Sequence, residues 1–297
     1  MNYHRKFIEY LLGILKQLKH KFYIFRWLYK KPNKDLDFLG HALLSIASRW
    51  EGEVEPVLTY ISLFDVLRQN KFKGNFLELG GGYSTILLPV LFENAINLKS
   101  IDLYPAKYKR ILNSSKNAKL FLSKLKIINK PTVTYKESIE GLEKIINYLS
   151  EIDERQLREN LSYFVTDKEI LNDIYQSIKE NNFLKKYIFE HPNFKSDYDF
   201  YLKNNILEGE GFCSKEAKED INYDAIFFDC GEISSVAEWL LLKDKIKKSG
   251  YAIFHDIFYP KSIKNFLVTT YIFNLNDWKV LYFDKVSPQG GLVAQRI

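Results

Sequence analysis

His255 and Asp256 stand next to each other at the end of a predicted strand, Ser249–Asp256. A histidine has an unperturbed pKa of about 6.5, which suits it to take the proton of a hydroxyl acceptor as a general base. Asp229 ends another predicted strand, Tyr223–Asp229, and carboxylates such as those of Asp229 and Asp256 are the oxygen ligands that divalent cations prefer. These residues predict either proton transfer or a metal ion that lowers the pKa of an acceptor.

Three consecutive glycines, Gly80–Gly82, lie between a predicted strand, Phe76–Leu79, and a predicted helix that runs through Phe92. Glycines permit positive φ and let the backbone come close to a ligand at the N-terminus of a helix. Ser84 or Thr85 is the predicted N-cap of that helix. A strand, a glycine-rich turn and a helix in this order indicate a nucleotide-binding loop.

Two common nucleotide-binding loops differ from this pattern. A dinucleotide-binding loop reads Gly-x-Gly-x-x-Gly, and counting from Gly80 the third glycine would fall at Thr85. A phosphate-binding P-loop would continue with Gly-Lys-Ser or Gly-Lys-Thr, which does not follow here. An NAD(P)-type oxidoreductase, which would need that third glycine, is kept as the alternative enzyme class.

The segment Glu78–Thr85 reads Glu-Leu-Gly-Gly-Gly-Tyr-Ser-Thr and resembles the first motif of the class I S-adenosylmethionine-dependent methyltransferases. That motif has an acid at the end of the strand, then Gly-x-Gly, then Ser or Thr. A carboxylate suits the ammonium and sulfonium groups of S-adenosylmethionine, whereas it would repel a pyrophosphate. The resemblance implies that S-adenosylmethionine is the cofactor and that it is bound by Glu78, Gly80, Gly81, Gly82 and Ser84.

The later strands of this family follow in order. Leu98–Tyr104 resembles the second strand, and the resemblance implies that Asp102 at its end accepts hydrogen bonds from the ribose hydroxyls. Thr132–Ser138 resembles the third strand, which implies that Ser138 lies beside the adenine. The remaining strands are Tyr223–Asp229, Ser249–Asp256, Trp278–Phe283 and Gly291–Arg296, and Asp229 is assigned to the cofactor as well.

The resemblance implies an α/β fold over residues 35–297. Within that range, a second helical stretch is predicted at about 56–69, before the first strand. The sheet would be Rossmann-like, seven-stranded and mostly parallel, with helices on both faces and an antiparallel final strand. About 75 residues, from about 144 to 221, stand where the family needs only one crossover helix. A loop of that length without secondary structure is rare, so we expect a helical insert that covers the strand ends and the acceptor. Its aromatic residues would stack on a ring or sugar, or form the core of the insert: Tyr187, Phe189, Phe194, Tyr198, Phe200 and Tyr201.

Three residues are the candidates for catalysis: His255, Asp256 and Glu232. In the catechol-type O-methyltransferases, acids at the ends of these same strands hold a divalent cation, which implies a Mg²⁺ ion on Asp229 and Asp256. Those relatives carry a further acid or Asn after the second Asp, where this chain has Ile257. Many related sequences place Gly-x-His after the fourth-strand Asp, so Glu232 would replace that histidine as base or acceptor ligand. The alternatives give Asp229 and His255 structural roles. The Asp229 carboxylate would accept hydrogen bonds from backbone amides, and His255 would form a hydrogen bond with the backbone.

The basic charge is concentrated in residues 1–34, here called the basic arm. Nine basic residues and one acidic residue give it a charge of +8, so the rest of the chain carries −2 out of the net +6. Enzymes that bind nucleic acids cluster Lys and Arg on the binding face, which argues against a nucleic-acid partner for the rest of the chain.

The spacing of apolar residues in the basic arm predicts an amphipathic helix, and its longest apolar run, Tyr10–Leu15, is too short to span a membrane. We expect the arm to contact either an anionic membrane surface, or the rest of the chain, or a second copy in a homodimer. Two cysteines are too few for a disulfide framework and favour a reducing compartment. This predicts a cytoplasmic protein, with contact to the inner membrane face as one option.

The sequence therefore predicts an S-adenosylmethionine-dependent methyltransferase that O-methylates a small molecule or a glycan. Two alternatives remain: the NAD(P)-type oxidoreductase, and a non-catalytic, membrane-attached module that has the methyltransferase fold.

Overall fold

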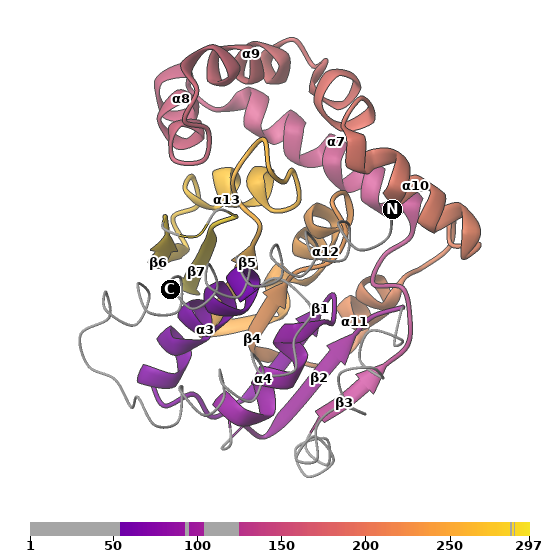
Figure 1. The fold of residues 1–297 in the computed structure, drawn as a ribbon, viewed down its shortest axis with the longest axis vertical. Coiled ribbons are helices and arrows are strands. Elements are labelled where there is room, and N and C mark those ends of the chain that lie inside the picture. The colour runs from indigo at the N-terminus through magenta and orange to yellow at the C-terminus, as the bar shows by residue number, and fades with distance from the viewer. Residues whose placement is uncertain (1–53, 93–94, 104–124, 286, 288) are drawn as a thin grey trace, which may run out of the picture.

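The computed structural model describes residues 54–92, 95–103, 125–285, 287 and 289–297, so the basic arm lies outside the described residues. Seven strands form one sheet in the order β3-β2-β1-β4-β5-β7-β6 (Figure 1). Neighbours from β3 to β5 pair in parallel, whereas β7 runs antiparallel to both β5 and β6. The strands are β1 Asn75–Leu79, β2 Asn97–Ile101, β3 Leu125–Ile128, β4 Tyr223–Phe228, β5 Ile246–His255, β6 Trp278–Asp284 and β7 Gly291–Arg296. The predicted α/β fold with an antiparallel final strand is confirmed.

The strand order also bears on the dinucleotide alternative. A dinucleotide-binding sheet has the order 3-2-1-4-5-6 with all strands parallel. Here β7 is inserted between β5 and β6 and reverses direction. The last two strands therefore depart from that sheet.

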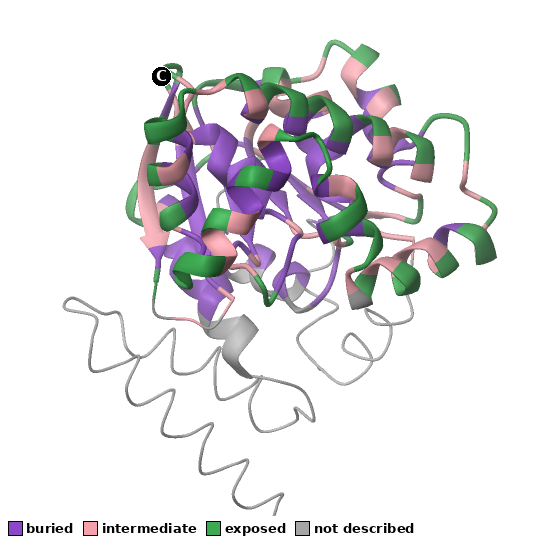
Figure 2. Ribbon diagram, turned by 90° about the horizontal axis from the view of Figure 1, so that it is seen from above, coloured by how far each residue is buried: buried purple, intermediate pink, exposed green. Residues whose placement is uncertain are grey.

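Helices cover both faces of the sheet because its strands bury alternate residues on opposite sides. In β4, Ala225 and Phe227 pack into a core with α3 (Val54–Gln69) and α4 (Tyr83–Leu91). Ile226 and Phe228 point the other way, into a core that includes residues of four helices outside the outer part of the insert. These are α7 Tyr135–Glu151, α11 Phe212–Lys218, α12 Ser234–Leu242 and α13 Phe266–Ile272. Figure 2 shows the buried strands and, on one side of them, helices whose outer surfaces are exposed.

The long insert is helical, as predicted. It comprises the end of α7, α8 (Glu154–Ser162), α9 (Lys168–Lys179), a π-helical turn (Leu184–Phe189), α10 (Pro192–Lys203) and α11. Leu157 of α8 and Ile174 of α9 are fully buried in the same core as α7 and α13. Figure 1 shows α8 and α9 as an outer layer across α7 from the sheet, whereas α11 lies beside the sheet.

The predicted third strand, Thr132–Ser138, is wrong. The third strand lies at Leu125–Ile128, and the following segment begins α7. Thr134 caps this helix: its hydroxyl accepts a hydrogen bond from the Glu137 amide, and the Glu137 carboxylate accepts one from the Thr134 amide. This reciprocal pair is a capping box, which fixes a helix start in place of an extended strand.

Two further features concern the cysteines and the lengths of the helices. Both cysteines, Cys213 and Cys230, are free. Within the described ranges, no helix is both long enough and apolar enough to cross a membrane.

Candidate active site

A cavity of about 370 Å³ lies at the carboxyl ends of β1, β2, β4 and β5. This is where ligands bind in open α/β sheets, because the loops that follow the strands meet there. Its lining includes Gly80, Gly81, Gly82, Asp102, Asp229, His255 and Asp256. The structure therefore brings together seven of the residues that the sequence predicted for the site.

Gly80 forms the wall between β1 and β4. Its φ is +84°, and a Cβ atom there would lie 2.2 Å from the carbonyl oxygen of Asp229. The Asp229 amide donates to the Leu79 carbonyl at 2.9 Å, and the Gly80 amide donates to the Ile101 carbonyl at 3.0 Å. A glycine is required here both by the positive φ and by the close approach of two backbone segments.

Glu78 supports the glycine turn from behind. Its carboxylate accepts hydrogen bonds from Ser84 Oγ at 2.5 Å, from Thr85 Oγ1 at 2.6 Å and from the Ser100 hydroxyl. Complete burial raises the pKa of Glu78 to about 7, although the three hydroxyls oppose this rise. Neither Glu78 nor Ser84 is among the residues that line the cavity, so the structure gives them a supporting position rather than the expected place beside the cofactor.

The helix after the turn begins two or three residues earlier than predicted. Gly82, and not Ser84 or Thr85, is the N-cap of α4. The Gly82 amide donates to Thr85 Oγ1 at 2.9 Å. Thr85 thus lies in the first turn of the helix and accepts a hydrogen bond from the N-cap residue. The Glu78 carboxylate draws both hydroxyls toward the sheet, which explains why neither caps the helix.

Asp102 follows β2 at the edge of the cavity, as predicted. Its amide donates to the Ile128 carbonyl at 3.2 Å, which ties the end of β2 to the end of β3. Ser138, in contrast, lies in the first turn of α7 and is fully buried. Its hydroxyl lies 3.0 Å from the Tyr201 hydroxyl, and it is Tyr201 rather than Ser138 that lines the cavity.

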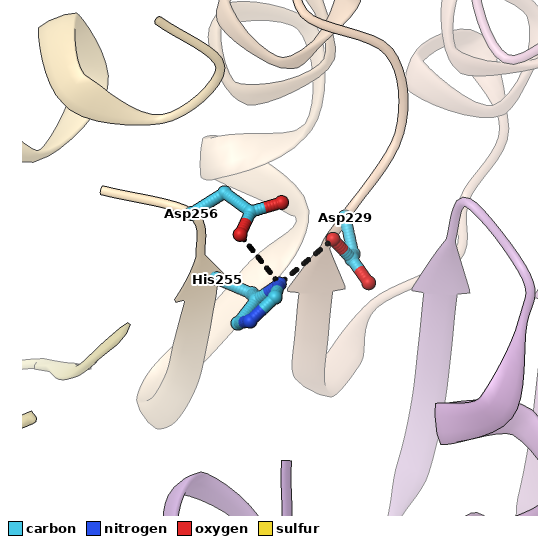
Figure 3. A group of neighbouring side chains, drawn as sticks. All are labelled: Asp229, His255 and Asp256. Carbon is cyan, nitrogen blue, oxygen red and sulfur yellow. Dashed lines mark hydrogen bonds and ion pairs between the residues drawn. The ribbon is translucent and has the colours of Figure 1, made fainter. Parts of the chain in front are cut away.

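His255, Asp229 and Asp256 meet at the ends of β4 and β5 (Figure 3). His255 Nδ1 lies 3.3 Å from Asp229 Oδ1 and 3.1 Å from Asp256 Oδ1, and its side chain is only 2% exposed. Asp256 has a positive φ of 58°, which turns its carboxylate back toward the histidine. The sequence predicted that these three residues meet.

Two residues of this cluster have no counterpart in the sequence prediction. The Tyr60 hydroxyl, from α3, donates to Asp229 Oδ2 at 2.9 Å. The Lys264 ammonium donates to Asp229 Oδ1 at 2.8 Å and to Asp256 Oδ2 at 3.1 Å. Both residues line the cavity. Their helix and loop carry no motif, so the sequence offers no signal that would find them.

The cluster shifts the protonation of its members. Burial alone would lower the pKa of His255, but the carboxylates of Asp256 and Asp229 raise it to about 9. Burial opposes the charged form of Asp256, yet His255 and Lys264 hold its pKa below the usual value. Burial likewise opposes the charged form of Lys264, and Asp229 and Asp256 raise its pKa well above normal. His255 therefore carries a proton at neutral pH.

Glu232 lies beside the cavity but does not line it. Its Oε2 accepts hydrogen bonds from Ser262 Oγ at 2.9 Å, from the Ile263 amide at 3.0 Å and from the Lys264 amide at 3.1 Å. Its Oε1 accepts one from Asn193 Nδ2 at 3.1 Å. The predicted base or acceptor ligand thus anchors the loop that carries Lys264.

The insert contributes part of the cavity wall. Asp197, Phe200 and Tyr201 of α10 line it, which confirms that the insert reaches the strand ends. Burial raises the pKa of Asp197. Other aromatic residues of the insert stack on one another: Phe183 on Tyr187 at 5.0 Å, and Phe194 on Tyr198 at 6.3 Å. Tyr187 also contacts Tyr259, and Tyr198 contacts Tyr135, both outside the insert.

The cluster does not fit the Mg²⁺ ion that the resemblance implies. Asp229, His255 and Asp256 offer ligand atoms within 4.8 Å of one another. However, the Lys264 ammonium bridges the two carboxylates. Ile257, at the position of the third ligand, is a fully buried core residue. Mg²⁺ would have to bind carboxylate oxygens that here face the Lys264 ammonium and the His255 ring.

The chain matches no protein-family model, and no curated protein matches its sequence. Solved structures similar to it include an O-methyltransferase from Bacillus cereus in complex with S-adenosylhomocysteine, at 12% identity over 89% of this chain and 92% of that one, with a TM-score of 0.44. A second is the O-methyltransferase TomG from Streptomyces achromogenes in complex with S-adenosylmethionine, at 10% identity over 92% and 94%, with a TM-score of 0.44. A third is the N-methyltransferase NodS from Bradyrhizobium japonicum, at 8% identity over 84% and 89%, with a TM-score of 0.41. The likeness is one of fold.

Proposed function

We propose that this chain is an S-adenosylmethionine-dependent O-methyltransferase whose acceptor is a hydroxyl group of a small molecule or a glycan. The proposal rests on one observation: the two ends of a single cavity are lined by different sets of residues. The glycine turn and Asp102 form one end, and Asp229, His255, Asp256 and Lys264 form the other. A transferase needs both ends, because it must hold a donor and an acceptor in line.

The charge of the cavity favours a cationic cofactor. Four carboxylates line it, from Asp102, Asp197, Asp229 and Asp256, against the cations of Lys264 and His255. S-adenosylmethionine bears a sulfonium and an ammonium, which such a lining attracts, whereas the pyrophosphate of a dinucleotide would be repelled. Gly80–Gly82 would hold the cofactor against the backbone and Asp102 would accept from its ribose hydroxyls. When bound, the cofactor supplies an electrophilic methyl group.

The other end suits a hydroxyl acceptor. The acceptor oxygen forms a bond to the methyl carbon while the carbon–sulfur bond breaks and its electron pair stays on sulfur. The hydroxyl proton leaves to the cluster, where Nδ1 of His255 lies between the carboxylates of Asp229 and Asp256. Since the pKa of His255 is raised to about 9, most of the histidine is protonated at neutral pH, and the base is the fraction that has released its proton to solvent. In that fraction the imidazole takes the hydroxyl proton as the carbon–oxygen bond forms.

Calorimetric titration with S-adenosylhomocysteine tests the cofactor. We expect the wild type to bind it and Asp102→Ala to bind it roughly 10- to 100-fold more weakly, because hydrogen bonds to a charged group are lost. Asp220→Ala is the matched control, since Asp220 is exposed and remote from the cavity. Binding of NADH by a wild type that does not bind S-adenosylhomocysteine would replace the proposal with the oxidoreductase alternative.

Release of S-adenosylhomocysteine tests the reaction. The wild type should release it in the presence of acceptors drawn from phenols, catechols and glycans, and mass spectrometry should show one added methyl group on an oxygen. Intact cofactor binding without turnover on any hydroxyl acceptor would favour the non-catalytic module.

A further inference from the structure

Two carboxylates from different strands converge on one ammonium group. Asp229 follows β4 and Asp256 follows β5, and Lys264 Nζ donates to an oxygen of each, at 2.8 and 3.1 Å. The three side chains are shielded from solvent, with exposed fractions of 7% for Asp229, 14% for Asp256 and 12% for Lys264. A charge-assisted bridge of this kind gains strength where water is excluded.

Three of the four carboxylate oxygens of the pair accept hydrogen bonds from groups of this chain, and the fourth, Asp256 Oδ1, accepts none but forms an ion pair with His255. Asp229 Oδ1 faces Lys264 and His255, and its Oδ2 accepts from the Tyr60 hydroxyl at 2.9 Å. Asp256 Oδ2 faces Lys264, and its Oδ1 pairs with His255 Nδ1 at 3.1 Å. A divalent ion would have to displace these donors, because a carboxylate oxygen that binds the ion gives up its bond to a cationic N–H group.

The backbone around Lys264 is fixed from two sides. The Lys264 amide donates to Glu232 Oε2 at 3.1 Å and to Ser262 Oγ at 3.2 Å. Next to it, the buried Asn265 side chain donates to the Phe228 carbonyl at 3.0 Å and to the His255 carbonyl at 2.6 Å, which are the last residues of β4 and β5. Hydrogen bonds therefore hold the backbone next to Lys264 against the same two strand ends that carry the carboxylates.

We propose that the Lys264 ammonium is the built-in cation of the acceptor site and takes the place of a divalent metal. This inference rests on the proposed methyl transfer. An ammonium has three N–H donors, and Asp229 and Asp256 take two of them. Lys264 lines the cavity, so the third is available to the acceptor oxygen, which it stabilises as the hydroxyl proton leaves for the cluster of Asp229, His255 and Asp256.

Binding of Mn²⁺, followed by electron paramagnetic resonance and calorimetry on the full chain, tests this proposal. The wild type should leave Mn²⁺ free. Lys264→Ala should acquire saturable binding of Mn²⁺, because it opens Asp229, His255 and Asp256 to the ion. Lys264→Arg keeps a cation in place and should leave Mn²⁺ free. Lys261→Ala is the matched control, since Lys261 is an exposed lysine three residues away.

The outcomes separate this proposal from the proposed function. Saturable Mn²⁺ binding by the wild type, lost in Asp256→Asn, would overturn the built-in cation even if S-adenosylhomocysteine binds. Absence of Mn²⁺ binding in a Lys264→Ala protein that still binds S-adenosylhomocysteine would overturn it as well, because the lysine would then not be what excludes the ion. In a turnover assay, wild-type activity should survive a chelator, and loss of activity that added Mg²⁺ restores would contradict the proposal.

Discussion

Asp229 receives donors from three parts of the chain: the Tyr60 hydroxyl from α3, the imidazole of His255 from β5 and the ammonium of Lys264 from the following loop. Its carboxylate is therefore held in one orientation at the centre of the cavity. His255 is held just as firmly, since its ring also packs against Tyr60 with the ring centroids 4.7 Å apart. The residues of the acceptor end thus depend on one another for both position and charge.

The raised pKa of His255 predicts a pH-dependent stability. The folded chain holds the His255 proton up to about pH 9, whereas the unfolded chain loses it near pH 6.5. The stabilising contribution is fully present below pH 6.5 and is lost as the pH rises through 9, on the order of 3 kcal/mol in total. Urea unfolding at steps between pH 6 and about pH 10 should show this decline in the wild type and a flatter curve in His255→Asn.

His191→Asn is the control for this measurement. His191 accepts a hydrogen bond from the Asn193 amide as the N-cap of α10, and asparagine serves well at that position. The variant should keep the wild-type decline with pH. Equal declines in the wild type and in His255→Asn would show that another group releases the proton.

The candidate site residues whose position could be predicted from the sequence are those at strand ends. Asp102, Asp229 and His255–Asp256 follow short apolar runs, and the carboxyl ends of parallel strands must meet. Tyr60 was beyond prediction because a tyrosine in an amphipathic helix is an ordinary core residue. Lys264 was beyond prediction because only the path of a loop brings it back onto the carboxylates.

At the scale of elements, the turn between β1 and α4 should tolerate no side chain at Gly80. In Gly80→Ala the new Cβ would overlap the backbone of Asp229 and also require an unfavourable positive φ. We expect a loss of about 2–4 kcal/mol in the free energy of unfolding. Urea denaturation measures this loss, and calorimetry should show weaker binding of S-adenosylhomocysteine.

Gly209→Ala separates the two causes. Gly209 also has a positive φ, of +97°, but a Cβ there would meet nothing within 4 Å. This variant should lose only the cost of the backbone conformation, about 1–2 kcal/mol, and should keep cofactor binding. Similar losses for the two variants would mean that the contact between Gly80 and Asp229 is relieved by a small shift of the backbone.

The elements were predicted well where hydrophobic runs were bounded by glycine or by acids, and poorly where two signals competed. The segment Thr132–Ser138 has the β-branched residues of a strand, but Thr134 and Glu137 also form the pattern of a capping box. The segment starts a helix because residues from Leu142 to Leu149 bury an apolar face of α7, which stabilises the helix. The hydroxyls of Ser84 and Thr85 misled the N-cap prediction in the same way, since the buried Glu78 binds both.

At the scale of the whole molecule, the charge divides into +8 on the basic arm and −2 on the rest of the chain. We propose that the arm binds an anionic membrane surface, because basic groups are attracted to anionic lipids. In a flotation assay, the full chain should rise with anionic vesicles, and the chain without residues 1–34 should remain in solution.

Salt and lipid composition control this result. Added salt should reduce flotation of the full chain, since it screens charges at the surface, and vesicles of neutral lipid should not carry the chain. A full chain that stays in solution, and whose dimer disappears when residues 1–34 are removed, would assign the arm to a second copy of the chain.

The contact between Gly80 and the backbone of Asp229 places the cofactor end and the acceptor end of the cavity on a shared wall. We therefore expect a ligand that orders the glycine turn to order the strand end that carries Asp229 as well. Thermodynamic linkage then requires reciprocity: the factor by which the first ligand changes the affinity for the second equals the factor in the opposite direction. Calorimetric titrations in both orders would measure this factor, and the two values should agree.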